Sequence, residues 1–302
     1  MPYVYPTRVR KTSVYLPEPL KDDLAALARR SGRSEAELIR LAVERLVRAA
    51  AIEGGPGRPE PVREAGPRLV GVGVGPSDPA LVTERAIRTL NDADRVFSAS
   101  TAPDAIGRAE AVVRAVAPEA RVERLVFDIA GDTDARAASV EGAADAVVAA
   151  LDAGAVVAFA MLGDPNVYST FPALARAVAS RRPSVPIATV PGVMAFQEVA
   201  ATSRTVVAED GERVVLTVAD GDTAPLDGLL DDRATTVVLY KGGRHLPAVA
   251  DALGRRARLQ GAVVGEMLGL PGGRCVEVGA VADQAASYLA TIVVPAVREE
   301  RG

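Results

Sequence analysis

The sequence contains almost none of three residue types that often carry chemistry. Its 302 residues include one cysteine, Cys275, one histidine, His245, and no tryptophan. A single cysteine cannot form a disulfide bond within the chain. Zinc sites of the Cys/His kind need about four such ligands, so the sequence predicts no metal site.

Aromatic residues are also scarce, at 4 %, although 49 % of the chain is hydrophobic. The core must therefore be built from Val, Ala and Leu. The most apolar stretch, residues 155–162, is far shorter than the roughly 20 residues that a membrane helix needs. The first residues contain no apolar segment of the kind found in secretory signals. We therefore expect a cytoplasmic protein with no membrane partner.

Charge is distributed unevenly along the chain. Residues 1–50 contain ten Lys and Arg against six Asp and Glu, a local net charge of +4, whereas the remaining residues carry −8. Such asymmetry predicts two modules with different partners. Between them, residues 51–67 are rich in Gly, Pro and Glu without periodicity, which is typical of a linker.

Residues 1–50 follow a strand–helix–helix pattern. Polar and apolar residues alternate over residues 8–16, which predicts a half-exposed strand. Pro17 opens a first helix that Gly32 ends, and Ser34 with Glu37 predicts the capping box of a second helix. The first helix carries Leu20, Leu24, Leu27 and Ala28 on one face, and the second is expected to bury Leu38, Leu41, Ala42 and Leu46.

This pattern resembles the ribbon-helix-helix family. In that family two chains pair their strands into one ribbon, which reads the DNA major groove. The resemblance implies a homodimer, and by position it implies that Lys11, Ser13 and Tyr15 would contact bases. The same module could instead serve only to dimerise the chain, with no role in DNA binding.

From residue 68 onward, short Val-rich runs alternate with Ala-rich helical patterns. Strands that alternate with helices predict an α/β fold with a largely parallel sheet. The strands are expected at residues 68–74, 155–161, 187–190, 214–218, 236–240, 262–268 and 290–294. The helices are expected at residues 81–90, 140–151, 173–181 and 246–253.

A glycine-rich loop over residues 71–79 follows the first of these strands. Asp78 is placed to cap the next helix, with Pro79 at its first position. Glycines permit close approach of the backbone to a ligand, and a helix N-terminus attracts negative charge. The dinucleotide fingerprint G-x-G-x-x-G fails because Pro76 occupies its last glycine position. By itself, the loop could equally be a tight structural turn.

Three further loops, at residues 161–174, 190–197 and 237–249, also follow predicted strands. Loops at the carboxyl ends of strands are where α/β proteins bind ligands. Taken together, the four loops resemble the tetrapyrrole methylase family, whose opening loop has the sequence G-x-G-x-G-P-G-D-P followed by L-L/V-T. The matching residues are Gly71, Gly73, Gly75, Pro76, Asp78, Pro79, Leu81 and Thr83, with Gly163-Asp164-Pro165 and Pro191-Gly192-Val193 in later loops.

Some residues depart from the family pattern, and others are similar to one subgroup of the family. Ser77 replaces a glycine of the opening loop, and Met194-Ala195 replaces a common Ser/Thr pair. Within the family, the chain is most similar to C20-methyltransferases of precorrin-2 or cobalt-factor II. The similarity lies in Tyr168-Ser169-Thr170-Phe171, in Phe196-Gln197 and in the pair Lys241 and Arg244.

The resemblance implies two α/β subdomains, residues 68–183 and 184–302, with S-adenosylmethionine (SAM) held between them. SAM would be the methyl donor in C-methylation of a tetrapyrrole at C20, a step of cobalamin biosynthesis. Main-chain groups and small side chains would do most of the binding. By position, the SAM site would be lined by Pro76, Leu162, Gly163, Asp164, Val167, Ser169, Thr170, Met194, Ala195, Lys241 and Leu268.

A tetrapyrrole carries many carboxylates, so cations are expected in the cleft. The candidates are Lys241, Arg204, Arg244, His245 and Arg274. Tyr168 could contact a ligand or only pack. Asp78 is the candidate base for removing a proton from the methylated carbon, although it could serve only as a helix cap.

Two other interpretations stay open. The same fold could methylate another position of the macrocycle, because residues 266–269 lack an Arg that related sequences contain. The basic N-terminal module also allows a DNA-binding regulator whose methylase-like body senses SAM or a corrinoid.

Overall fold

The computed structural model describes residues 14–43, 66–128, 133–219 and 221–298. The chain divides into two compact units, Met1–Ala65 and Gly66–Gly302. Each unit is described by itself.

The N-terminal unit contains the two helices that the sequence predicts. Helix α1 (Glu18–Ser31) begins after Pro17 and ends at Gly32, which adopts the left-handed conformation common at helix C-termini. A second helical segment covers residues 35–43. The capping box is confirmed, because the Ser34 amide donates to the Glu37 carboxylate at 3.0 Å and the Glu37 amide donates to Ser34 Oγ at 3.3 Å.

The apolar faces of these helices are not buried within the unit, contrary to the sequence prediction. Helix α1 has no buried residue, and Leu20 and Leu27 are 52 % and 44 % exposed. Of the residues that the second helix was expected to bury, Leu38 is half-buried, Leu41 and Ala42 are exposed, and Leu46 lies outside the described residues. Two short helices have too little surface to cover each other. The predicted strand lies mostly outside the described residues, and residues 14–17 have no regular structure.

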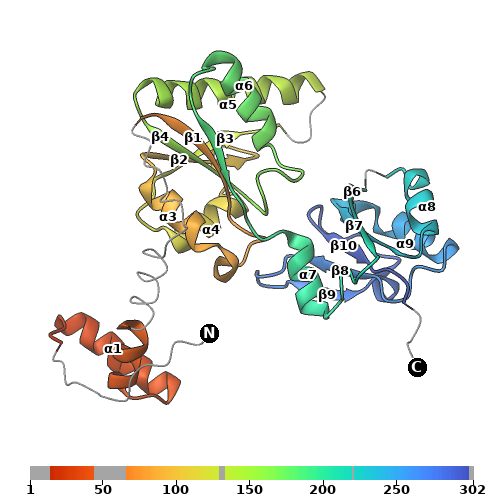
Figure 1. Cartoon of the computed structure of the whole chain (residues 1–302), viewed down its shortest axis with the longest axis horizontal. Coiled ribbons are helices and arrows are strands. Elements are labelled where there is room, and N and C mark those ends of the chain that lie inside the picture. The colour runs from red at the N-terminus through yellow and green to blue at the C-terminus, as the bar shows by residue number, and fades with distance from the viewer. Residues whose placement is uncertain (1–13, 44–65, 129–132, 220, 299–302) are drawn as a thin grey trace. The chain divides into compact units, whose positions relative to one another are not determined.

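The first sheet of the larger unit contains five parallel strands flanked by helices. The strands are β1 (Arg68–Gly73), β2 (Arg95–Ser100), β3 (Val122–Val126), β4 (Val156–Met161) and β5 (Ile187–Val190). The helices are α3 (Glu84–Asp92), α4 (Arg108–Val116), α5 (Thr133–Asp152) and α6 (Phe171–Arg181). The strand order is β3-β2-β4-β1-β5. Helices α5 and α6 cover one face and α3 and α4 the other, each over an apolar core (Figure 1).

The second sheet is mixed, whereas the sequence analysis predicted largely parallel strands. Its strands are β6 (Arg213–Val218), β7 (Thr235–Tyr240), β8 (Val263–Glu266), β9 (Arg274–Glu277) and β10 (Thr291–Val294), in the order β6-β7-β10-β8-β9. Only β6 and β7 pair in parallel. Strands β8 and β9 are joined by a short loop, which permits an antiparallel pair but not a parallel crossover.

Three helices cover the second sheet. Helix α7 (Ala195–Ser203) packs on one face through Phe196 and Val199. Helices α8 (Ala224–Asp231) and α9 (Leu246–Arg255) pack on the other face through leucines such as Leu230 and Leu253. Strand β5 belongs to the first sheet because it pairs with β1. The two sheets therefore separate after Val190, not after residue 183 as the sequence analysis divided them.

Candidate active site

Three glycine loops meet at the carboxyl ends of β1, β4 and β5. The Gly163 amide donates to the Gly75 carbonyl oxygen at 2.8 Å, which joins the loops after β4 and β1. A Cβ at Gly192 would lie 2.1 Å from the Gly163 carbonyl oxygen and 2.9 Å from the Gly73 Cα. Only glycine permits this approach, so the sequence spacing positions three backbone segments against one another.

Asp164 connects two of these loops through its carboxylate. Its Oδ1 accepts from the Asn166 amide at 2.8 Å, and its Oδ2 accepts from the Gly192 amide at 3.2 Å. The second bond crosses from the loop after β4 to the loop after β5. Asp164 therefore holds the shape of the site as well as lining it.

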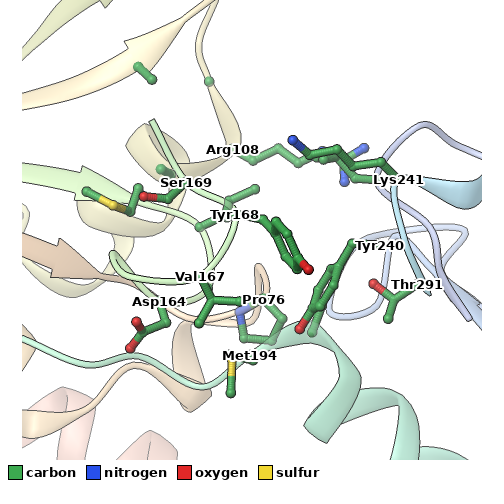
Figure 2. Close-up of a pocket in the computed structure, with 18 of the residues that line it drawn as sticks. Pro76, Arg108, Asp164, Val167, Tyr168, Ser169, Met194, Tyr240, Lys241 and Thr291 are labelled. Atoms are coloured by element: carbon green, nitrogen blue, oxygen red, sulfur yellow. The ribbon is translucent and has the colours of Figure 1, made fainter. Parts of the chain in front are cut away.

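A cavity of about 490 Å³ lies beside these loops. It is lined by the loops after β1, β2 and β4, by the start of α7, and by the ends of strands in the second sheet. The sequence analysis named eleven residues for the SAM site, and all of them line this one cavity. They are Pro76, Leu162, Gly163, Asp164, Val167, Ser169, Thr170, Met194, Ala195, Lys241 and Leu268. Figure 2 labels some of these residues, among them Pro76, Asp164 and Lys241.

Two tyrosines form an aromatic part of the wall. Tyr168 has a backbone φ of 47°, and its hydroxyl donates to the Leu216 carbonyl oxygen of β6 at 2.7 Å. Its ring lies 5.5 Å from the Tyr240 ring, centroid to centroid, and Figure 2 shows the two rings next to each other. Burial raises the pKa of Tyr240 to about 12, so this side chain stays a neutral phenol.

Two cations line the cavity, and neither forms an ion pair with any residue that the structure describes. Lys241 follows β7 with a left-handed backbone, φ 59°, and Arg108 begins α4. Both side chains are half-buried. Unpaired, partly desolvated cations favour an anionic ligand. The sequence analysis missed Arg108 because the loop after β2 carries no recognisable motif.

Three buried polar atoms of the cavity wall have no hydrogen-bond partner among the described residues. They are Glu198 Oε2 on α7, the Tyr240 hydroxyl on β7 and Thr291 Oγ1 on β10. Buried polar groups are almost always paired in folded proteins. These three atoms are therefore available to a ligand.

Most of the cations expected from the sequence lie elsewhere. Arg204, Arg244, His245 and Arg274 do not line the cavity. Arg274 is neutralised by Glu266 at 2.6 Å, and the Arg244 guanidinium lies over the Tyr288 ring at 4.9 Å. Arg204 ends α7 and is exposed, and His245 lies beside Gly221.

Asp78 occupies the position of a cap. Its Oδ1 accepts from the Ala80 amide at 2.8 Å at the start of a 3₁₀ turn, Pro79–Leu81, and it does not line the cavity. Of the residues that the ribbon-helix-helix resemblance implies would contact DNA, Lys11 and Ser13 lie outside the described residues, and Tyr15 is 97 % exposed.

Residues 68–283 match the model of the Tetrapyrrole (Corrin/Porphyrin) Methylases. The chain belongs to this family. A precorrin-2 C(20)-methyltransferase of Sinorhizobium sp is 30 % identical over 240 residues, which cover 76 % of this chain and 95 % of that protein. The cobalamin biosynthesis protein CobIJ of Mycobacterium tuberculosis is 32 % identical over 76 % of this chain and 46 % of its own length. The chain is thus a tetrapyrrole methyltransferase, and its relatives include enzymes of cobalamin biosynthesis.

Solved structures of tetrapyrrole methylases share the fold. The cobalt precorrin-4 methyltransferase CbiF superimposes with a TM-score of 0.59 at 22 % identity, over 76 % of this chain and 94 % of that chain. The uroporphyrin-III-C-methyltransferase of Thermus thermophilus gives 0.54 at 21 % identity, over 77 % and 93 %. The family is generally SAM-dependent.

The N-terminal module has its own match. Residues 10–50 match the model of ribbon-helix-helix proteins of the copG family, which agrees with the sequence resemblance. Within the described residues, no helix is long and apolar enough to cross a lipid bilayer.

Proposed function

We propose that this chain uses SAM to methylate C20 of precorrin-2 or cobalt-factor II. The observation that carries the proposal is the convergence of all eleven motif-derived residues on one cavity. The similarity to a precorrin-2 C(20)-methyltransferase over 95 % of that protein supports the choice of carbon.

The residues around the cavity fit SAM. Gly163, in the loop after β4, lines the cavity and has no side chain to separate its backbone from a ligand. Thr291 Oγ1 is an unpaired polar atom of the wall that is able to bond a hydroxyl or an ammonium group. The apolar wall, which includes Leu162, Val167 and Met194, suits the adenine ring and the aliphatic part of the methionine chain.

When bound, SAM supplies a methyl group already activated on a sulfonium. The chain therefore has to hold the acceptor carbon in line and exclude water, and alignment of this kind contributes several kcal/mol. Asp164 and the three glycine loops hold the wall in place. Tyr168 joins the loop after β4 to β6 and sets the distance between two sides of the cavity.

Arg108 and Lys241 are the proposed anchors for the carboxylates of the macrocycle. Each is half-buried and unpaired within the described residues, so a bound carboxylate gains a charge-assisted hydrogen bond. Arg204, Arg244, His245 and Arg274, the other cations that the sequence analysis named for the substrate, do not line this cavity.

Incubation of the purified chain with SAM and precorrin-2, and separately with cobalt-factor II, tests the proposal by mass spectrometry. We expect one added methyl on one substrate, and a ¹³C-methyl label places it at C20. A methyl group found at another carbon would reject C20 as the position of methylation and assign that carbon instead. No methyl on either substrate, with SAM bound in a titration, rejects the proposal.

The contribution of Arg108 can be measured separately. We expect Arg108→Gln to raise KM for the tetrapyrrole about tenfold or more, since a hydrogen bond to a charged group contributes about 1.5–3 kcal/mol. SAM affinity should stay unchanged. Arg176→Gln, an exposed position on α6, is the matched control and should leave both constants as they are. An unchanged KM for Arg108→Gln removes this side chain from the substrate site.

For the N-terminal module, we propose that it joins two copies of the chain through the apolar faces of its helices. The exposed Leu20 and Leu27 support this proposal. DNA binding is a second candidate function, supported by the +4 charge of residues 1–50 and the ribbon-helix-helix match. It predicts a steep salt dependence that is lost when Lys11, Ser13 and Tyr15 are all changed to Ala. If the unaltered chain binds no DNA at low salt, DNA binding is rejected and dimerisation is the proposed function of the module.

A further inference from the structure

Glu198 is a carboxylate in the cavity wall that the sequence motifs do not account for. It lies in the first turn of α7 and lines the cavity beside Met194 and Ala195. Its Oε2 is buried and accepts no hydrogen bond from any described residue. An unpaired buried carboxylate is unfavourable for folding. Stabilisation of the fold therefore does not explain this carboxylate.

The surroundings of Glu198 contain no compensating cation. Burial raises the pKa of Glu198, and the negative charge of Asp78 raises it further. On β9, Cys275 packs against α7 with its Sγ 3.8 Å from the Val199 carbonyl oxygen. Burial is the main cause that raises the pKa of this thiol, and the Glu198 charge adds a smaller increase. No cation offsets the charge of Glu198 at this position among these described neighbours.

The remaining charged groups on the strands packed against α7 do not neutralise Glu198. Glu266 on β8 and Arg274 on β9 pair with each other at 2.6 Å, and Glu277 on β9 is exposed. Strand β10 carries no charged residue. The cavity cations Lys241 and Arg108 form no ion pair with Glu198. Glu198 is therefore poised to take up a proton.

We propose that Glu198 is the base that accepts the proton released from the methylated carbon, an inference that rests on the proposed function. Methyl addition to a ring carbon that bears hydrogen leaves both substituents on that carbon and one added positive charge on the macrocycle. The C–H bond then breaks, and its electron pair returns to the conjugated ring. The proton goes to Glu198 Oε2 and then to solvent, which restores the carboxylate.

Asp78 has a supporting role in this scheme. Its Oδ1 is occupied by the Ala80 amide, and its side chain does not line the cavity. Burial raises the pKa of Glu198, and the charge of Asp78 raises it further in the direction of neutral pH, where a general base is most effective. This assigns proton removal to Glu198 and leaves Asp78 as a cap that tunes it.

Kinetics of two variants test the assignment. We expect Glu198→Gln to lower kcat about 100-fold or more, the usual contribution of a general base, with SAM affinity unchanged. Asp78→Asn keeps an oxygen for the Ala80 amide but removes the charge, so the acidic limb of the pH–rate profile should move to lower pH. Glu277→Gln is the matched control and should leave turnover and the profile unchanged. A Glu198→Gln enzyme with unaltered kcat overturns the proposal.

The single cysteine offers a readout that is independent of turnover. The pH dependence of iodoacetamide alkylation reports the pKa of Cys275, the only thiol of the chain. Burial is the main cause of the raised thiol pKa and the Glu198 charge adds to it, so Glu198→Gln should lower that pKa by a small amount, and Glu277→Gln should not. An identical thiol pKa in the unaltered chain and in Glu198→Gln contradicts the charged carboxylate that the proposal requires.

Thermal unfolding separates a functional carboxylate from a structural one. The pKa of Glu198 is raised by folding, so the folded state binds the proton more tightly, and stability falls as pH rises through that interval. Glu198→Gln should therefore raise Tm at neutral pH and above, with a smaller effect in acid. A lower Tm across the whole range indicates a structural residue and rejects the inference. Failure of the unaltered chain to methylate either substrate rejects both proposals, whereas equal turnover by chain and variant rejects only this one.

Discussion

Ser77 is a residue at which the glycine-rich loop departs from its family pattern at a cost in stability. Its backbone has a φ of 147°, in the region that favours glycine. Its side chain is 3 % exposed, and its Oγ has no hydrogen-bond partner among the described residues. Strained backbone and an unpaired hydroxyl both oppose folding.

We expect Ser77→Gly to increase the free energy of unfolding by about 1 kcal/mol. Relief of the backbone and of the hydroxyl contributes roughly 1–3 kcal/mol, and the flexibility of glycine in the unfolded chain offsets part of it. Calorimetry measures the change. Ser77→Ala removes only the hydroxyl, so it should stabilise the protein less than Ser77→Gly, and a larger effect of the alanine variant contradicts the backbone argument.

At the scale of elements, Glu110 ties α4 to β3. The side chain is 1 % exposed and accepts from Arg124 of β3 and from Arg114 of α4, each at 2.6 Å. The Arg124 hydrogen bond is the main cause that lowers the pKa of Glu110, and Arg114 adds to it. Because this carboxylate is buried, loss of its charge leaves two guanidinium groups without their partner.

Glu110→Gln should lower the free energy of unfolding by about 3–5 kcal/mol at neutral pH. The contribution of a carboxylate with a lowered pKa is complete above its unfolded pKa and is lost as pH falls through its folded pKa. The gap between the two proteins should therefore narrow in acid. Glu123→Gln, which breaks the exposed pair with Arg95, is the control and should cost about 1 kcal/mol or less. If both variants lose the same free energy of unfolding, burial of the Glu110 carboxylate does not explain its contribution to stability.

Substitution of glycine by alanine should have opposite effects on stability at two positions, because the surroundings of the two glycines differ. Gly142 lies exposed within α5, and a Cβ there meets no atom within 4 Å. Gly142→Ala should stabilise the helix by about 0.5–1 kcal/mol. Gly192→Ala places a Cβ against the Gly163 carbonyl, so it should lower Tm and SAM affinity together. Chemical denaturation and a SAM titration of both variants test the pair, and a stable, SAM-binding Gly192→Ala protein argues against the loop geometry.

At the scale of the whole molecule, we expect the N-terminal unit to join two copies of the chain and the larger unit to carry out the chemistry. The larger unit has its own apolar cores on both faces of each sheet. The apolar residues of α1 are exposed, and a second copy of the module offers a matching surface.

Leu27→Glu, and removal of residues 1–65, should therefore convert a dimer into a monomer without changing turnover per chain. Light scattering coupled to size exclusion measures the mass, and Glu18→Gln on the same helix serves as a control that leaves the assembly intact. A shortened chain that stays dimeric assigns the interface to the larger unit instead.

The sequence by itself determined the features that depend on neighbouring residues. Apolar runs placed β1, β4, β5 and β7 to within a residue or so, and the spacing of Ser34 and Glu37 determined a cap that the structure confirms. The glycine, proline and aspartate spacing of four loops identified the family and the residues that line the cavity. Strands β2, β3 and β9 were missed because polar residues such as Ser98 and Arg124 interrupt their apolar pattern.

Only the tertiary structure decided which side chains share the cavity with those loops. Arg108 and Glu198 line it, whereas Arg244 and Arg274 have other partners, although all four are ordinary charged residues in the sequence. The strand directions in the second sheet and the placement of α7 bring residues that are far apart in the sequence, such as Arg108 and Glu198, to the wall of one cavity. No local pattern encodes such contacts, because they depend on the packing of whole elements against one another.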